Sequence, residues 1–391
     1  MKKKIYLDYA ASTPIDPRVL KLMSVQLKNN FGNSSSLHWY GQQAQQVLEE
    51  SRKTVAKALG AQLEEIIFTS SATESNNTAL KGIAFANKDK GRHIITSLIE
   101  HDCILNSAKW LEKQGWKITK VGVDKYGLID PVEVVKAVRK DTILVSIMHA
   151  NNEIGTIEPI EEISKICRVK NIYFHTDAAQ SFGKIPIDVN KMKIDLLTAS
   201  SHKMYGPKGA ALLYIRKGTK IEPLLHGGGH EFDWRSSTVN IPAIAGFAQA
   251  VSICQKEMRK EAEKTIILRN KLIKGILKKI PNSFLNGHPQ KRLSNNVNIR
   301  FSGVEGEAII MHLNANGIAA STGSACSSQS LQPSHVLKAL GLKPGEIHGS
   351  LRLSLGRWTT EEEINFVLEI LPKIIKNLRE ISPFYVHQKS S

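Results

Sequence analysis

Short apolar runs alternate with longer amphipathic stretches through the first two-thirds of the chain. Several runs, such as residues 143–147, are apolar at nearly every position, as expected of strands covered on both faces. This alternation predicts an α/β fold with a mainly parallel seven-stranded sheet and helices on both of its faces. The expected strands are 65–69, 93–97, 117–123, 142–149, 172–176, 196–199 and 210–215. The expected helices between them are 73–87, 102–114, 131–139 and 160–169.

The pattern changes after the predicted sheet. A long helix is expected from about Pro242, a residue suited to a first helical turn, to about Lys279, with room for one break. A smaller α+β unit follows, and its last helix opens on Thr360-Glu-Glu-Glu363, a capping box. Its expected strands are 296–301, 318–321 and 350–354, and its helices are 305–314, 334–340 and 360–380. We therefore expect a large domain, 15–258, and a small C-terminal domain, 259–391, on which the N-terminal segment 1–14 packs.

The composition is that of a soluble globular protein. Hydrophobic residues make up 41% of the 391 and charged residues 23%. No stretch approaches the roughly 20 apolar residues of a membrane helix, so we expect no membrane partner. The four cysteines are far apart and form no CxxC pair, which argues against a zinc ribbon or a disulfide framework. Free thiols in the cytoplasm are the better interpretation.

The chain is strongly basic, with a formal net charge of +17, which raises nucleic-acid binding as a hypothesis. The lysines are nevertheless scattered along helices rather than gathered with aromatic residues. Those of the long helix are Lys256, Lys260, Lys264, Lys271, Lys274, Lys278 and Lys279. We therefore favour a solvated basic face over a nucleic-acid site, and an anionic substrate or an acidic protein partner also suits the charge.

Two charged side chains follow neighbouring strands of the predicted sheet. Lys203 lies in Ser200-Ser-His-Lys203-Met-Tyr-Gly206, just after a strand, where hydroxyls and glycines offer phosphate contacts around an amine that can form a Schiff base. Asp177 ends another strand, where a carboxylate can hold a pyridine nitrogen protonated. An aspartate there can equally cap the next helix, so the pair of positions matters more than either alone.

Two further segments are predicted to reach the same edge of the sheet. Residues 68–75 pass from a strand through small residues into a helix, whose free amides can bind an anion. Ser71 and Glu74 also fit a capping box, which is a structural explanation for the same residues. His101 follows a third strand, and a lone histidine is more often structural, so it gains weight only from its neighbours.

The C-terminal third contributes a cysteine and an arginine. Cys326 lies in a polar, small-residue segment, 319–333, that is typical of an exposed loop and favours a reactive thiol. Cys103, Cys167 and Cys254 fall in apolar helical surroundings, where we expect them only to fill space. Arg352 lies among apolar neighbours on a strand, so it needs a carboxylate, either structural or from a substrate.

With these pieces in place, the sequence resembles the cysteine desulfurases of the iron–sulfur-cluster and nitrogen-fixation type, within the class V aminotransferase family. The resemblance covers nearly the whole chain. It begins at Tyr6-Leu-Asp-Tyr-Ala-Ala-Ser-Thr-Pro14 and continues in order through 31–38, 149–155, 226–230 and 350–357. It implies a fold-type I pyridoxal-phosphate enzyme. Ser71 departs from the pattern, since glycine is frequent there, and a serine would strain a turn of positive φ.

Carried over residue by residue, the resemblance implies pyridoxal 5′-phosphate as the cofactor. Lys203 would form its Schiff base and later move the α-proton, His101 would stack on the ring and transfer protons, and Asp177 would pair with the pyridinium nitrogen. The other implied cofactor contacts are Gln180 at the ring hydroxyl, Asn152, the phosphate ligands Ala72, Thr73, Ser200 and His202, and Thr238 at the cofactor of the second subunit of a homodimer.

The resemblance also implies the reaction. Arg352 and Asn152 would bind the carboxylate of L-cysteine, and Cys326 would take the substrate sulfur as a persulfide while alanine leaves. The acceptor would be an iron–sulfur scaffold protein or another sulfur acceptor, including one for tRNA thiolation. No resident metal is expected, although Cys326 could become a cluster ligand through its persulfide.

Rival interpretations share the fold. A plain aminotransferase needs no thiol at Cys326, so that residue argues against one, whereas a selenocysteine lyase or another class V enzyme remains open. A basic binding protein without catalysis is the rival from another class, and the intact set of Lys203, Asp177, His101 and Arg352 argues against it.

Overall fold

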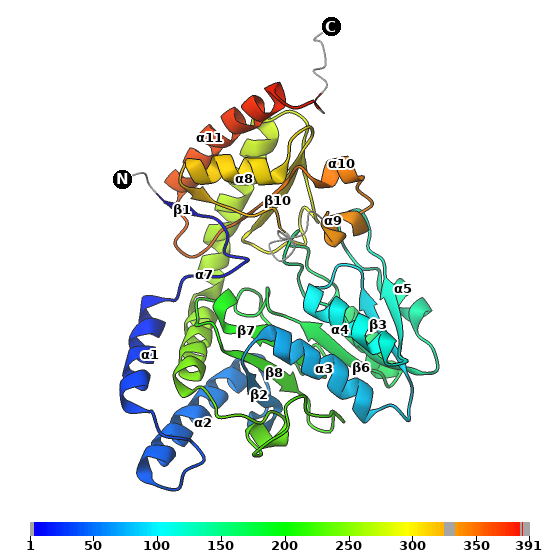
Figure 1. The fold of residues 1–391 in the computed structure, drawn as a ribbon, viewed down its shortest axis with the longest axis vertical. Helices are drawn as coiled ribbons and strands as arrows, with labels where there is room; N and C mark the ends of the chain where they lie inside the picture. Colours follow the sequence, from blue (N-terminus) through cyan, green and yellow to red (C-terminus); the bar gives the residue numbers. More distant parts are fainter. Residues whose placement is uncertain (1–3, 324–332, 384, 386–391) are drawn as a thin grey trace.

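The computed structural model describes residues 4–323, 333–383 and 385, so Cys326 lies outside the described residues. A seven-stranded sheet forms its largest layer, in the order β2-β8-β7-β6-β5-β3-β4 (Figure 1). β8 runs antiparallel to both of its neighbours, and the remaining pairs are parallel. The strands are β2 (Ile66–Thr69), β3 (His93–Ser97), β4 (Lys117–Val121), β5 (Thr142–Ser146), β6 (Tyr173–Asp177), β7 (Leu196–Ser200) and β8 (Ala211–Ile215).

Helices cover both faces of this sheet. Apolar side chains of α3 and α4 share a buried cluster with one face, while those of α2, α6 and α7 share another with the opposite face. Neighbouring strand residues such as Ile66 and Ile67 belong to different clusters, because successive side chains of a strand alternate between faces. The helices are α1 (Pro17–Asn29), α2 (Trp39–Leu59), α3 (Ala72–Ala86), α4 (Asp102–Lys113), α5 (Pro131–Ala137), α6 (Ile160–Val169) and α7 (Ile241–Lys279).

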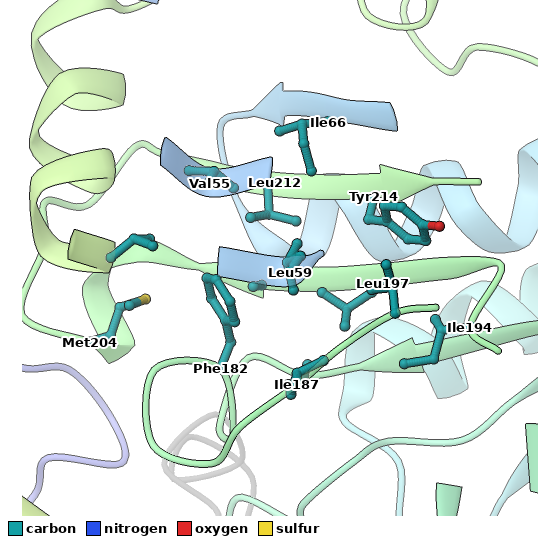
Figure 2. Close-up of a cluster of buried hydrophobic side chains, with 14 of the residues drawn as sticks. Val55, Leu59, Ile66, Phe182, Ile187, Ile194, Leu197, Met204, Leu212 and Tyr214 are labelled. Carbon is teal, nitrogen blue, oxygen red and sulfur yellow. The ribbon is translucent and has the colours of Figure 1, made fainter. Parts of the chain in front are cut away.

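Figure 2 shows the larger of these clusters, in which α2 packs on β2, β7 and β8. Phe182 and Met204 also belong to it, and they come from the loops that follow β6 and β7. The cluster therefore fixes these two loops against the sheet as well as the helix.

A smaller C-terminal unit sits at the other end of α7 (Figure 1). Its antiparallel sheet has the order β12-β10-β9, and a short parallel pair joins β1 to β11. The strands are β1 (Ile5–Tyr6), β9 (Ser283–Leu285), β10 (Asn296–Phe301), β11 (Ile318–Ala319) and β12 (Ser350–Ser354). The helices are α8 (Gly306–Ala315), α9 (His335–Ala339), α10 (Pro344–Ile347) and α11 (Glu361–Glu380).

These elements confirm the predicted α/β fold with a mainly parallel seven-stranded sheet. The capping box at the start of α11 is confirmed, with Thr360 and Glu363 each bonded to the other's main-chain N–H. α7 runs for 39 residues without the break for which the sequence left room. Within the described part of the chain, no helix combines the length and apolar character needed to span a membrane.

Candidate active site

The carboxyl ends of the parallel strands open into a cavity of about 770 Å³. Loops after β2, β3, β5, β6 and β7 line it, together with the N-terminal segment and β12 of the C-terminal unit. Ligands of open α/β sheets bind at this edge because the loops there carry side chains from several strands. The predicted site residues that line the cavity are Ala72, Thr73, His101, Asn152, Asp177, Gln180, His202, Lys203 and Arg352.

Lys203 ends η2 (Ser201–Lys203), a single 3-10 turn that follows β7 directly. Its Nζ donates to the main-chain oxygens of Ala10 and Ala11, each at 2.7 Å. Burial, reinforced by the positive charges of Arg352 and Lys184, lowers the pKa of the Lys203 amine to about 8. Near neutral pH a useful fraction of this amine is therefore unprotonated, as a nucleophile requires.

Asp177 is the last residue of β6 and is nearly buried. Its Oδ2 accepts from Asn76 Nδ2 at 2.7 Å, and its Oδ1 accepts from the main-chain N–H of Ala179 at 2.9 Å. The alternative role foreseen for this aspartate, capping a following helix, is not realised, because turn residues and not a helix follow β6. The bond to Ala179 closes the first of these turns. It does not exclude a role toward a ligand, because the same residue lines the cavity.

His101 is the N-cap of α4, since its Nδ1 accepts from the main-chain N–H of Cys103 at 3.2 Å. An Nδ1 that accepts carries no proton, so the neutral ring carries its proton on Nε2. The histidine is thus structural and lines the cavity at the same time.

Cys103 corrects one expectation, because it lines the cavity instead of merely filling space. Its Sγ lies 3.1 Å from His101 Nδ1 and 3.1 Å from Asn76 Nδ2. Asn76 Nδ2 also donates to Asp177 Oδ2, so the Cys103 thiol and the Asn76 amide together connect His101 to the Asp177 carboxylate. Burial raises the pKa of the Cys103 thiol to about 12, which keeps it protonated.

The N-terminus of α3, where the sequence predicts an anion cradle, opens into the cavity. Ser71 is the N-cap and accepts from Glu74 N at 3.1 Å, with an extended φ of −162° that strains nothing in place of glycine. The predicted capping box is half formed, because Glu74 bonds Ser70 instead of the N-cap main chain. The first-turn residues Ala72 and Thr73 face the cavity.

His202 lines the same cavity, and its Nδ1 is 3.3 Å from Ser12 Oγ. Burial and the nearby Lys203 lower the pKa of the His202 imidazole to about 4, so the ring is neutral at neutral pH. Two predicted phosphate contacts are not among the residues that line the cavity. Ser200 is buried at the end of β7, and Thr238 is exposed on the loop before α7.

Arg352 reaches the cavity from β12 with a side chain that is only 3% exposed. Its guanidinium donates to the main-chain oxygens of Asn152 (2.9 Å) and Gly323 (3.1 Å) and to Asp8 Oδ1 (2.9 Å). The structural carboxylate foreseen as one possibility is therefore Asp8. Its buried Nε has no hydrogen-bond partner among the described residues, so the guanidinium keeps one free donor.

Several site residues were missed by the sequence analysis. Asp8, Ala10 and Ala11 belong to the quoted N-terminal motif, but no signal assigned them to Arg352 or Lys203. Asn76 lies inside the helix that opens at the cradle, one turn from Thr73, and helical spacing alone could have brought it to this edge.

The residues present fit pyridoxal phosphate. The Lys203 amine, with its lowered pKa, suits the aldehyde of the cofactor. Asp177, 26 positions earlier along the chain, suits the pyridine nitrogen. The 15-residue helix α3, which opens into the cavity, suits the phosphate. The orphan donor of Arg352 would suit a substrate carboxylate.

Known proteins resemble this chain over almost its whole length. The class-V aminotransferase family model matches residues 5–367. The cysteine desulfurase IscS of Dictyoglomus turgidum is 52% identical over 384 residues, which is 98% of both chains. The IscS of Methanosarcina thermophila is 53% identical over 381 residues, covering 97% of this chain and 94% of the relative.

Solved structures agree with these relatives. A NifS-like protein superposes with a TM-score of 0.91 at 38% identity, covering 96% of this chain and all of its own. A structure of SspA in complex with cysteine has a TM-score of 0.82, also at 38% identity, and covers 92% of this chain. The chain therefore belongs to the class-V aminotransferase family and, within it, to the cysteine desulfurases of the IscS and NifS type.

Proposed function

We propose that this protein is a pyridoxal-phosphate-dependent cysteine desulfurase that converts L-cysteine to L-alanine and retains the sulfur on Cys326. The observation that carries the proposal is the meeting of Lys203, Asp177, His101 and Arg352 in one cavity. These residues come from four segments far apart in the chain, and each has the chemistry that one part of the reaction needs.

The chain's own residues would bind and orient the reactants. When bound, pyridoxal phosphate supplies an electron sink that acidifies the substrate Cα–H and weakens the Cβ–S bond. The Lys203 amine would attach the cofactor and move the proton at Cα, while Asp177 would hold the proton on the pyridine nitrogen. His101, with its proton on Nε2, would stack on the ring and donate or accept that proton at the reacting atoms.

The remaining contacts would fix the phosphate and the substrate. Gln180 would contact the ring hydroxyl, and Arg352 with Asn152 would hold the substrate carboxylate through charge-assisted bonds. The phosphate would lie at the start of α3, held by Ala72, Thr73 and His202, which line the cavity. Ser200, which the family resemblance also implies as a phosphate contact, is buried at the end of β7 and does not line the cavity.

The sulfur transfer needs no added oxidant. The thiolate of Cys326 attacks the substrate sulfur, so an S–S bond forms as the Cβ–S bond breaks. The electron pair of the broken bond stays with carbon and is protonated, which gives alanine. Cysteine and an enzyme thiol thus become alanine and an enzyme persulfide.

The test compares the wild-type chain with Cys326→Ala and Lys203→Ala. With added cofactor and a reductant, wild type should release alanine and sulfide from L-cysteine in equal amounts. Cys326→Ala should release almost none, and Lys203→Ala should lose the absorption band of the covalently attached cofactor. A wild-type chain that binds the cofactor but acts only on selenocysteine, or on another amino donor, would replace the proposal with that second class V activity.

We further propose a homodimer in which Thr238 reaches the phosphate of the partner subunit's cofactor. Thr238 is exposed on the loop before α7 and is not among the residues that line the cavity of its own chain. Three exposed apolar side chains, Phe31, Leu37 and Trp39, lie where α1 leads into α2, and a dimer interface there would remove them from water. Light scattering on the purified protein tests this proposal, and a monomer that retains full activity would refute it.

We propose an iron–sulfur scaffold protein, or another sulfur acceptor such as one for tRNA thiolation, as the partner. The high identity to proteins named IscS supports this choice. Transfer of ³⁵S from the loaded enzyme to a purified scaffold would test it. We place the protein in the cytoplasm because its described cysteines, Cys103, Cys167 and Cys254, are all unpaired.

We also propose that the chain divides into a large domain, 15–258, and a small one, 259–391, that carries segment 1–14. Separate apolar clusters support this division, since Ile5 and Leu7 belong with Leu268 and Leu371 in the C-terminal cluster. Limited proteolysis within residues 255–264, where α7 buries no side chain, would test it.

A further inference from the structure

A second lysine lies behind the cofactor site, in a role that the proposed reaction leaves unassigned. Lys184 lies in the turn after β6, and although the residue keeps some exposed surface, its amine is enclosed. Among the described residues it has no carboxylate within ion-pair distance, and its Nζ donates to two main-chain oxygens instead. An enclosed cation without a carboxylate partner carries a large desolvation cost, so its retention calls for an explanation.

Both oxygens belong to residues of the site. Lys184 Nζ donates to the oxygen of Gln180 at 2.9 Å and to that of Lys203 at 3.1 Å. The side chains of those two residues point the other way, and both donate to the oxygen of Ala10, at 2.9 Å and 2.7 Å. Lys184 therefore fastens, from behind, the two main-chain segments that present the amine and the amide to the cavity.

The same loops are also held by apolar packing. Phe182 and Met204, the neighbours of these segments, are both buried in the cluster on the β-sheet (Figure 2). Gly183 leaves room for the Met204 side chain, because a Cβ at residue 183 would lie 2.6 Å from Met204 Cε. The Lys184 amine is thus held within a tightly packed part of the protein.

Charge adds a second effect of Lys184. The charged groups that act on the Lys203 amine are Arg352 of β12 and Lys184, which disfavour its protonation, and Asp8 and Asp177, which favour it. The groups that act on Lys184 itself come from α7, namely Cys254 and Glu261. Burial lowers the pKa of Lys184 to about 8, so it carries its charge through most of the neutral range.

We propose that Lys184 is a positioning residue that holds the main chains of Gln180 and Lys203 and, through its charge, favours the neutral form of the Lys203 amine. This role rests on the proposed function of Lys203. Lys184 does not touch the reacting atoms, so it acts through its two neighbours.

The test uses the full-length, cofactor-free protein and three variants. Lys184→Met removes the charge and both bonds, Lys184→Gln removes the charge but keeps a donor, and Lys184→Arg keeps the charge. Pyridoxal phosphate is added over a range of pH, the adduct is trapped with borohydride, and peptide mass spectrometry measures the rate of capture at Lys203. The melting temperature of each variant is measured alongside.

In the wild type, capture should rise with pH through a midpoint near 8, where the amine loses its proton. Lys184→Met and Lys184→Gln should move this midpoint upward by up to about half a unit, because a nearby like charge is gone, and capture at pH 7 should fall by up to roughly threefold. Lys184→Arg, which stays charged through this pH range, should keep the midpoint at or below the wild-type value.

A merely structural lysine would lower the melting temperature of Lys184→Met and Lys184→Gln without moving the midpoint, and that result would overturn the proposal. If Lys184→Met does not fold, Lys184→Gln still separates the two outcomes, because it also lacks the charge. Failure of the underlying function is separately visible, because the wild-type adduct would then appear on a lysine other than Lys203.

Discussion

Asp8 and a substrate carboxylate compete for the same guanidinium, and the substitution Asp8→Asn exposes that competition. Asp8 Oδ1 accepts from Arg352 Nη2 at 2.9 Å, and the Arg352 side chain is 3% exposed. If Arg352 holds the carboxylate of L-cysteine, substrate binding must displace Asp8 or share the guanidinium with it. Neutralising Asp8 therefore favours the substrate.

The size of the effect follows from the two hydrogen bonds compared. A bond to a charged group contributes about 1.5–3 kcal/mol, and one between neutral partners about 0.5–1.5 kcal/mol. Asparagine keeps a neutral acceptor, so the difference is about 1–1.5 kcal/mol. Since about 1.4 kcal/mol corresponds to a factor of ten, Asp8→Asn should lower KM for L-cysteine by roughly five- to tenfold. The unfolding free energy should fall by a similar amount.

The assay measures alanine formation against cysteine concentration, together with inhibition by L-alanine, which carries the same carboxylate and does not react. Asp16→Asn is the matched control. Asp16 pairs with Arg357 Nη1 at 2.6 Å through a side chain that is 3% exposed, but it does not line the cavity. It should lower the melting temperature and leave KM and the inhibition constant unchanged. An Asp8→Asn protein with unchanged or higher KM would refute the competition, because Asp8 would then only orient Arg352.

Three further results are expected. Burial raises the pKa of the Glu100 carboxyl to about 8, so the protonated carboxyl stabilises the fold at low pH, and this contribution to stability is lost as the pH rises through 8. Glu100→Gln should therefore raise the melting temperature at pH 9 but not at pH 4. Equal gains in melting temperature at both pH values would contradict this. Cys103, with its pKa near 12, should react with iodoacetamide at pH 8 far more slowly in the native than in the urea-unfolded protein, as peptide mass spectrometry can check, and equal rates would show a reactive thiol. Gly356→Ala should cost about 1–3 kcal/mol in denaturant unfolding, since its Cβ would lie 2.1 Å from Tyr9 Cε1, and a wild-type midpoint would mean that the ring moves freely.

The sequence predicted the sheet better than its details. β3 and α6 match their predicted bounds because strands buried on both faces and strongly amphipathic helices leave clear patterns. The reversal of β8 could not be predicted, since an apolar run carries no information on direction. α1 and α2 were not predicted, although α2 buries Ala44, Leu48 and Val55 at helical spacing, so that signal was present in the sequence.

The site was predictable where one strand end supplies one residue, as for Asp177 and Lys203. Contacts between distant segments were not, because no local pattern brings Asp8 to Arg352 across 344 positions. The enclosed Lys184 was equally hidden, since lysine after a glycine is typical of an exposed loop. Cys103 was misjudged because its helical surroundings gave no sign that the first turn of α4 opens into a cavity.

The path of residues 5–11 has a consequence for the order in which the enzyme can be completed during its synthesis. The main chain of Leu7 bonds Ser354 N at 2.8 Å, Ala10 N bonds Ser354 Oγ at 2.9 Å, and Ile5 N bonds Gly317 O at 2.8 Å. Because the chain emerges from the ribosome N-terminus first, these early residues must wait for β12 before they can take their places. The carbonyls that meet Lys203 are thus set only after β12 (Ser350–Ser354) has been made, so cofactor capture should come after the synthesis of β12 and not while the large sheet is being made.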